Sequence, residues 1–173
     1  PKDAPRAKAL YQLACDGGDA LGCVNLGYYL EQGVAGDKDF PEARRLYALG
    51  CEGGEARGCA NLGWMLQEGL GGETDHLQAR DLYSRACNGG EARGCTNLGF
   101  MFERGFGGAK DDLGARALYE QGCAGDNAVG CANLGYFAEN GIGGPRDRAL
   151  ARELFQKSCD RGVEHACEGL TRL

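Results

Sequence analysis

Ten cysteines are the residues with the clearest chemistry in this 173-residue chain. They form five pairs with eight residues from the first member to the second, and successive pairs are 36 residues apart. The pairs are Cys15 and Cys23, Cys51 and Cys59, Cys87 and Cys95, Cys123 and Cys131, and Cys159 and Cys167. Cysteines eight residues apart in one straight helix lie roughly 12 Å apart, whereas a disulfide needs Cα atoms within about 7 Å. A turn must therefore separate the two members of a bonded pair.

Residues 16–19, Asp-Gly-Gly-Asp, supply such a turn between Cys15 and Cys23. The spacing then predicts one disulfide within each helical hairpin, because the repeat symmetry selects the local pairing among the many that ten cysteines allow. Metal binding is the competing interpretation, but CxxC is absent and only His76 and His165 are available as further ligands. Free thiols would not explain why the cysteines recur as five pairs at one spacing. We therefore expect disulfides, an oxidising compartment, no metal and no cofactor.

Each 36-residue unit reads as two helices. In the second unit, small and apolar side chains recur twice at the helical spacing i, i+3, i+4, i+7: Ala43, Leu46, Tyr47 and Gly50, then Cys59, Leu62, Gly63 and Leu66. Asp39 is the expected N-cap, with Pro41 in the first turn and Glu42 three residues after the cap. Asp3, Asp75, Asp111 and Asp147 hold the cap position in the other units. The helices end at residues 53–54 and at Gly69, where glycine suits the turn. No strand pattern competes, so the fold class is all-α.

The repeated unit Ala-x-x-Leu-Tyr-x-x-x-Cys-x-Gly-Gly-x-Ala-x-Gly-Cys-x-Asn-Leu-Gly, followed by Gly-Gly-x-x-Asp, resembles the Sel1-like repeat, a relative of the tetratricopeptide repeat. The added cysteines resemble the Helicobacter cysteine-rich protein subgroup, which has one disulfide per repeat. The resemblance implies a right-handed α-solenoid of five helical hairpins with a concave face, exported in bacteria and used for protein–protein contacts. We expect a single domain over residues 1–173, with repeats at about 3–38, 39–74, 75–110, 111–146 and 147–173.

Some members of that cysteine-rich subgroup are described as penicillin-binding proteins or β-lactamases, so the two serines need a test. A serine nucleophile of this kind has a lysine three residues later, and neither Ser84 nor Ser158 has one. Ser158 also stands at the helix position of Gly50 and Gly122, which favours a packing role. We predict no catalytic residues and no enzyme activity. A penicillin- or peptidoglycan-binding protein, or a β-lactamase-like hydrolase, is the alternative.

Three sets of equivalent residues are candidates for the surface that binds a partner, because repeat proteins line their grooves with equivalent positions. The basic ladder is Lys8, Arg44, Arg80, Arg116 and Arg152. It would grip partner carboxylates or form a solvated face with pairs such as Arg116 and Glu120. The Asn ladder is Asn25, Asn61, Asn97 and Asn133, with Gly169 in the last unit. It would brace neighbouring repeats or present amides to a peptide backbone.

The aromatic ladder is Tyr28, Trp64, Phe100 and Tyr136, and it is followed by Tyr29, Met65, Met101 and Phe137. We expect both sets to form the core between repeats, since stacked repeats bury both faces of the second helix. Burial in the core would then explain why aromatic residues recur at these positions, without a bound ligand.

The net charge and the hydropathy of the chain argue against two kinds of partner, nucleic acid and the membrane interior. A formal net charge of −6 argues against nucleic acid, which requires a basic patch, and no apolar run approaches the ~20 residues that span a membrane. We predict a periplasmic or secreted scaffold with a protein or peptide partner in its concave groove, or a cell-wall component. The mitochondrial intermembrane space is the alternative location. Because the chain starts at Pro1 without Met, we expect a mature product or a structural module of a longer protein.

Overall fold

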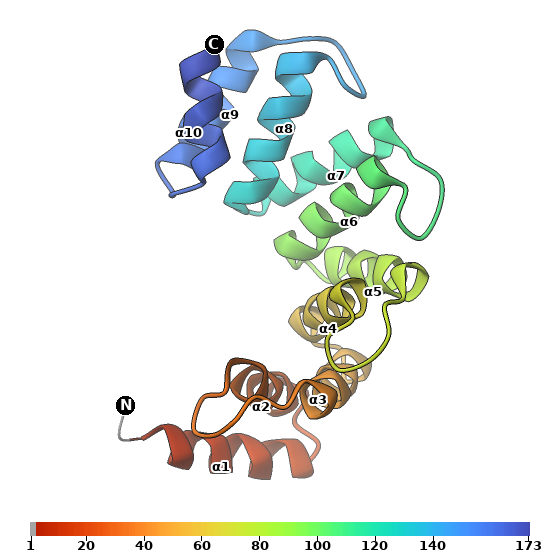
Figure 1. Cartoon of the computed structure of the whole chain (residues 1–173), viewed down its shortest axis with the longest axis vertical. Helices are drawn as coiled ribbons and strands as arrows, with labels where there is room; N and C mark the ends of the chain where they lie inside the picture. The colour runs from red at the N-terminus through yellow and green to blue at the C-terminus, as the bar shows by residue number, and fades with distance from the viewer. Residues whose placement is uncertain (1–2) are drawn as a thin grey trace. The chain divides into compact units, whose positions relative to one another are not determined.

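The computed structural model describes residues 3–173, and in this part of the chain ten helices follow one another with no strand between them (Figure 1). In chain order they are α1 (Ala4–Asp16), α2 (Ala20–Gln32), α3 (Phe40–Glu52), α4 (Ala56–Glu68), α5 (His76–Asn88), α6 (Ala92–Arg104), α7 (Asp112–Ala124), α8 (Ala128–Asn140), α9 (Arg148–Cys159) and α10 (Glu164–Arg172). The expected all-α fold of five helical repeats is confirmed.

The repeated aspartates begin the odd-numbered helices. Asp39 accepts a hydrogen bond from the backbone N–H of Glu42 at 3.0 Å, and Asp75, Asp111 and Asp147 make the equivalent bond. Asp3 precedes α1 without such a bond, so the expectation of a side-chain cap is wrong in the first repeat. Its backbone has φ −102° and ψ 1°, away from the extended conformation that directs a capping side chain toward the helix.

The disulfides join the two helices of each hairpin. Cα–Cα distances are 4.5 Å for Cys15–Cys23, 4.6 Å for Cys51–Cys59 and 4.4 Å for Cys123–Cys131. Cys159–Cys167 spans 4.8 Å, and Cys87 and Cys95 are disulfide-bonded as well. One disulfide per repeat is therefore confirmed. A turn of three residues, or of four between α9 and α10, brings the two cysteines of each pair within reach, as the Gly-rich spacing predicts.

The chain divides into two compact units, Pro1–Gly89 and Gly90–Leu173. In the first unit α2 packs against α3 and α4 against α5, so each hairpin contacts the next along the chain. The second unit repeats the arrangement, with α6 against α7 and α8 against α9. Even-numbered helices also touch their even-numbered neighbours, namely α2 with α4, α6 with α8, and α8 with α10.

Glycine in the middle of the even-numbered helices lets the next repeat approach closely. A Cβ on Gly63 would lie 2.9 Å from Cε1 of Tyr83, and a Cβ on Gly27 would lie 2.9 Å from Cε1 of Tyr47. In the second unit Gly99 and Gly135 meet the rings of Tyr119 and Phe155 at the same 2.9 Å. The helix-weakening glycine is therefore present because an aromatic ring lies directly against the backbone.

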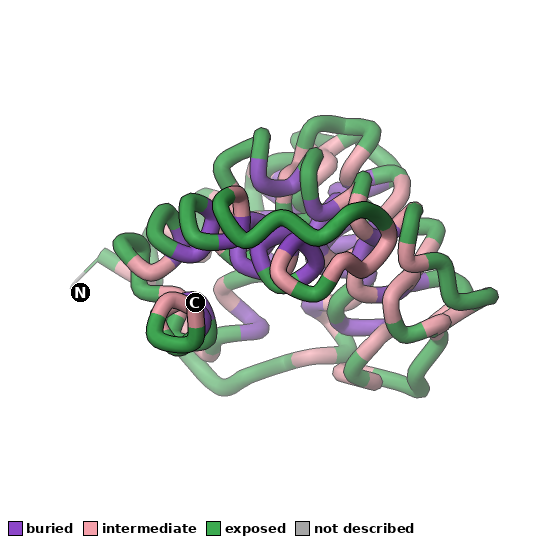
Figure 2. Tube along the Cα trace, turned by 90° about the horizontal axis from the view of Figure 1, so that it is seen from above, coloured by how far each residue is buried: buried purple, intermediate pink, exposed green. Residues whose placement is uncertain are grey.

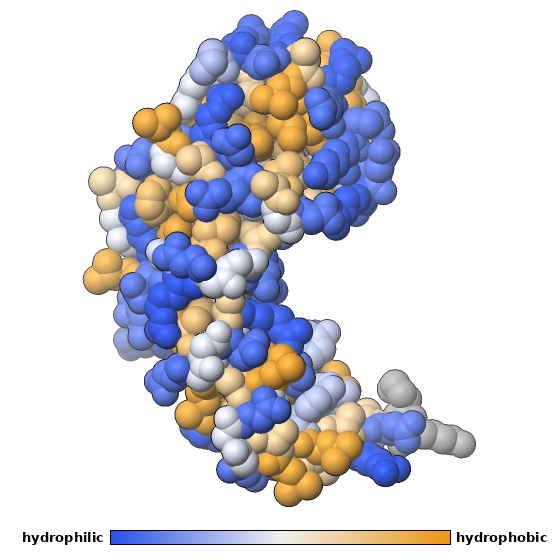
Figure 3. Space-filling model, turned by 180° about the vertical axis from the view of Figure 1, so that it is seen from behind, coloured by the Kyte–Doolittle hydropathy of each residue, from blue (hydrophilic) through white to orange (hydrophobic). Residues whose placement is uncertain are grey.

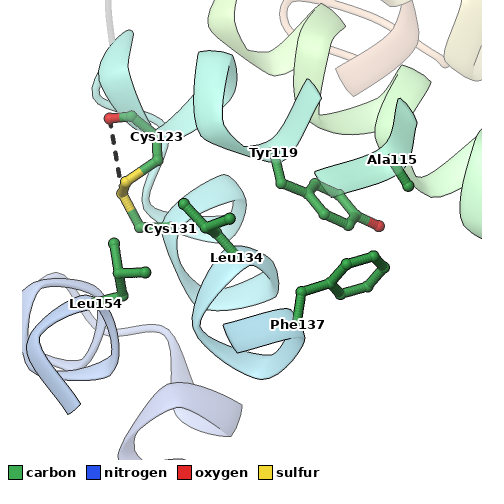
Figure 4. Packing of buried hydrophobic residues seen from close by; sticks show 7 residues of the cluster. All are labelled: Ala115, Tyr119, Cys123, Cys131, Leu134, Phe137 and Leu154. Carbon is green, nitrogen blue, oxygen red and sulfur yellow. Dashed lines mark hydrogen bonds between the residues drawn. A yellow bond between two sulfur atoms is a disulfide. The ribbon is translucent and has the colours of Figure 1, made fainter. Parts of the chain in front are cut away.

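Buried residues gather along the helix faces that point toward neighbouring helices, while the loops are mostly exposed (Figure 2). One core cluster of the second unit combines the ring pair Tyr119 and Phe137 with the Cys123–Cys131 disulfide (Figure 4). The rings meet edge to face, with centroids 5.2 Å apart. Leu134 and Leu154 complete the contact between α8 and α9. This core is thus built from two aromatic rings, one disulfide and aliphatic side chains.

Candidate functional site

The aromatic ladder is divided between core and surface. Tyr28, Trp64 and Tyr136 are exposed, by 51%, 37% and 46% respectively, and Phe100 is half-buried. The residues that follow them are Met65, Met101 and Phe137, which are buried, and Tyr29, which is half-buried. The expectation that both sets form the core is therefore wrong for the first set. Successive side chains of a helix point about 100° apart, so only one of two neighbours faces the hairpin core.

The Asn ladder lies on the same helices, three residues before each of these aromatic side chains. Asn25 accepts a hydrogen bond from Nη2 of Arg57 at 2.6 Å, which links α2 to α4. Asn133 is half-buried on α8. Asn61 is buried and Asn97 is half-buried. We call the surface of α2 and α4, and separately that of α6 and α8, the ladder face of each unit: it carries the Asn and aromatic ladders.

The ladder face of the second unit contains a hollow of about 250 Å³ between α6 and α8. Its lining consists of Phe100, Glu103, Arg104, Asn133, Tyr136 and Phe137. In Figure 3, apolar side chains reach the surface over the end of the chain that holds α8, with hydrophilic residues around them. The hollow thus combines aromatic rings with a carboxylate, an amide and a guanidinium group.

Three buried tyrosines donate hydrogen bonds to acidic or amide side chains of the preceding even-numbered helix, and the sequence did not predict these contacts. The Tyr47 hydroxyl donates to Glu31 at 2.6 Å, and the Tyr119 hydroxyl donates to Glu103 at the same distance. Tyr83 makes the equivalent bond to Gln67 at 3.1 Å. The constant separation of sixteen residues between acceptor and tyrosine was the available signal. Burial, together with the Glu103 carboxylate, holds the pKa of Tyr119 far above its usual range.

The fifth repeat lacks this contact, because Phe155 stands where the others have tyrosine. Glu139, the corresponding carboxylate, is paired instead with Arg172 of α10, whose Nη2 lies 3.6 Å from Oε2. The Glu139 side chain is only 13% exposed. A guanidinium group therefore lies beside the last carboxylate, but it does not make the hydrogen bond that the tyrosine hydroxyls make in the other repeats.

Comparison with family models matches the Sel1 repeat over residues 1–19, 20–55, 56–91, 92–127 and 128–163. The chain belongs to the Sel1 repeat family. The family's repeat begins at an even-numbered helix and ends after the next odd-numbered one, whereas we expected the odd-numbered helix to come first. Both divisions have the same 36-residue period. Proteins of this family are generally interaction scaffolds without catalytic function.

Three solved structures are similar to this Sel1 repeat protein. The Sel1 repeat protein of Oxalobacter formigenes is 26% identical, with a TM-score of 0.88 over 94% of this chain and 65% of its own. A protective antigen of uropathogenic Escherichia coli strains, c5321, displays an SLR fold and is 28% identical, with a TM-score of 0.84 over 94% of this chain and 35% of its own. Cysteine rich protein B of Helicobacter pylori is 30% identical, with a TM-score of 0.60 over 76% of this chain and 94% of its own.

The chain thus spans 65% of the length of the Oxalobacter protein and 35% of that of the Escherichia coli antigen. A comparison with curated proteins gives no match. Among residues 3–173, no helix combines the length and the hydropathy needed to cross a membrane.

The basic ladder of the Sel1 repeats lies on the odd-numbered helices. Arg44 donates to the carbonyl of Glu73 at 3.2 Å, and Arg116 donates to the carbonyls of Ile142 and Pro145 at 3.2 and 3.4 Å. These carbonyls belong to the loops between α4 and α5 and between α8 and α9. Lys8 and Arg80 are half-buried and Arg152 is exposed. The hollow includes one member of the Asn ladder and none of the basic ladder.

The two serines lie apart from the ladder face. Ser158 is buried in α9, and its hydroxyl donates to the carbonyl of Leu154 at 2.8 Å. This is the packing position that its alignment with Gly50 and Gly122 indicates. Ser84 is half-buried in α5. The hydroxyl hydrogen of Ser158 is therefore already used inside its own helix.

Proposed function

We propose that this Sel1 repeat protein binds extended segments of a partner protein or peptide on the ladder faces of its two units. The observation that carries the proposal is the exposure of Tyr28, Trp64 and Tyr136 at equivalent positions beside the Asn ladder. Large aromatic side chains that remain at the surface of a folded domain are frequent binding hot spots. Asn amides next to them supply the donors and acceptors that a peptide backbone requires.

The partner is met in an oxidising compartment, either the bacterial periplasm or the outside of the cell. Five disulfides in a chain of this size are typical of exported proteins, because cytosolic reductants keep thiols reduced. The resemblance to the cysteine rich protein of Helicobacter pylori supports the same location. Function then depends on a fold whose hairpins are closed covalently.

Selection from a phage-displayed peptide library would test the ladder face. Peptides enriched on the wild-type chain would be measured against a Trp64→Ala/Tyr136→Ala double variant. We expect at least about tenfold weaker binding, because an aromatic hot spot contributes about 2 kcal/mol or more. Leu77→Ala/Leu113→Ala is the matched control, since these leucines are 72% and 71% exposed on the odd-numbered helices α5 and α7.

The control variant should bind as the wild type does. Equal binding of the enriched peptides to the wild type and to the Trp64→Ala/Tyr136→Ala variant would contradict the proposal, because the selected segment would then contact another surface.

A further inference from the structure

The hollow between α6 and α8 has the composition of a site for an organic cation. Three aromatic rings, those of Phe100, Tyr136 and Phe137, surround it together with the carboxylate of Glu103. Aromatic faces attract a guanidinium or ammonium group, and a carboxylate pairs with guanidinium through charge-assisted hydrogen bonds. The Glu103 side chain is 24% exposed, so its charge is partly withdrawn from water and yet reachable from the hollow.

The two oxygens of Glu103 are in different situations. Oε2 accepts the hydrogen bond of the Tyr119 hydroxyl at 2.6 Å, which fixes the orientation of the carboxylate. Oε1 lies 3.8 Å from Nε of Arg104, beyond hydrogen-bonding distance. One oxygen is thus held by the core, while the other is only loosely paired.

Arg104 lines the hollow, but only weak interactions hold its guanidinium group there. Its side chain is 58% exposed, and its guanidinium carbon lies 5.5 Å from the ring centroid of Phe100. An exposed ion pair of this kind contributes little free energy. The side chain can therefore move aside when a better-placed cation arrives.

A carboxylate beside an arginine side chain already occurs within the chain, one repeat further on. Glu139 lies 36 residues after Glu103, and Arg172 lies 36 residues after Tyr136. The guanidinium Nη2 of Arg172 is 3.6 Å from Oε2 of Glu139. The equivalent carboxylate in the last repeat therefore already has an arginine from a neighbouring helix beside it.

We propose that the hollow receives an arginine side chain of the bound segment, with its guanidinium group on Glu103 and against the ring of Tyr136. Asn133 also lines the hollow, so its carboxamide oxygen is a further acceptor for an N–H of the arginine or of its backbone. The inference rests on the proposed peptide-binding function and specifies the side chain that the second unit recognises.

Titration of N-acetyl-arginine amide into the ¹⁵N-labelled chain tests the site. We expect backbone amide shifts at residues 100–104 and 133–137, with a dissociation constant on the order of millimolar. Glu103→Gln should weaken binding at least about tenfold, because the charge pair is lost. Arg104→Gln should strengthen binding about threefold, since the competing guanidinium is removed. N-acetyl-glutamate amide should give no shifts at these residues.

The equivalent position of α4 supplies the folding control for Glu103→Gln. Gln67 is the natural counterpart of Glu103, and it still accepts the hydroxyl of Tyr83 at 3.1 Å. The glutamine variant should therefore keep the hydrogen bond from Tyr119, and its spectrum without ligand should match that of the wild type outside the hollow.

Absence of shifts in the wild type, equal affinity of the Glu103→Gln variant, or equal binding of the glutamate amide would each overturn the arginine site. Library peptides that require Tyr136 but bind equally well with their arginines replaced would also overturn it, while leaving the peptide-binding function intact. Failure of the library to yield any peptide dependent on the ladder face would overturn the function itself.

Discussion

Tyr119 shows how one side chain joins three helices. It lies on α7, donates its hydroxyl hydrogen to Glu103 of α6, and packs its ring edge to face against Phe137 of α8. The sequence predicts either a bracing or a peptide-binding role for the Asn ladder. In the structure Asn25 accepts from Arg57 of the next repeat, whereas Asn133 lines the hollow. The period identifies equivalent residues. It does not identify which side chains meet, because this depends on how helices pack across repeats.

Ala35 carries a local strain that the other repeats avoid. Its φ is +64°, whereas the equivalent residues Gly71, Gly107 and Gly143 have φ of +74°, +67° and +62°. The left-handed conformation costs a non-glycine residue about 1–2 kcal/mol. Ala35→Gly should therefore raise the free energy of unfolding by about 0.5–1 kcal/mol, after allowance for the flexibility of glycine in the unfolded chain.

Urea denaturation would measure this change. Ala9→Gly, an exposed position inside α1, is the control with the opposite sign and should cost about 1 kcal/mol. A loss of stability in Ala35→Gly would show that the residue is not strained.

The helices themselves follow from short-range signals that a single sequence carries well. Asp39 predicts the beginning of α3, and Gly69 the end of α4, where it has φ of +69°. Glu42 departs from the expected capping box, because its carboxylate accepts from Arg45 at 2.7 and 2.9 Å. The exposure of Trp64 beside buried Met65 was not predicted either. Spacing alone does not say which of two adjacent apolar residues faces the core.

Gly63→Ala tests the close contact between α4 and α5. Alanine normally stabilises a helix by about 1 kcal/mol relative to glycine. Here the new methyl group would lie 2.9 Å from the ring of Tyr83, and overpacking of a core costs about 1–3 kcal/mol. We therefore expect a net loss of stability, or at most no gain, in urea denaturation.

Combination with Tyr83→Leu identifies the cause of that loss. In this background the ring is absent, so Gly63→Ala should stabilise the chain. The same destabilisation in both backgrounds would refute the contact between Gly63 and Tyr83 as the reason for the glycine.

The repeat as a whole was the most predictable feature of the chain. Five cysteine pairs at one spacing predict the hairpins, their turns and their disulfides together, since each signal recurs in every unit. The candidate site was less predictable. Its hollow depends on residues such as Phe100 and Arg104, whose roles arise from contacts between α6 and α8 and not from a local pattern. The repeated sequence is enough to predict the helices and their disulfides. The residues that form the hollow depend on packing between side chains that are far apart in the sequence.

The disulfides should decide whether the chain folds at all. Closing a nine-residue loop stabilises a protein by about 2.6 kcal/mol in the chain-entropy model, so five such loops contribute on the order of 13 kcal/mol. A domain has a total stability of about 5–15 kcal/mol. Reduction with a water-soluble phosphine should therefore abolish the cooperative thermal transition, followed by far-UV circular dichroism.

The oxidised chain carried through the same treatment without reductant is the control, and it should keep its transition. Since repeat stabilities are approximately additive, a Cys123→Ala/Cys131→Ala variant should lose about one fifth of the total effect. A reduced chain that melts within a few degrees of the oxidised one would show that packing around residues such as Tyr119 and Phe137, and not covalent closure, holds the hairpins together.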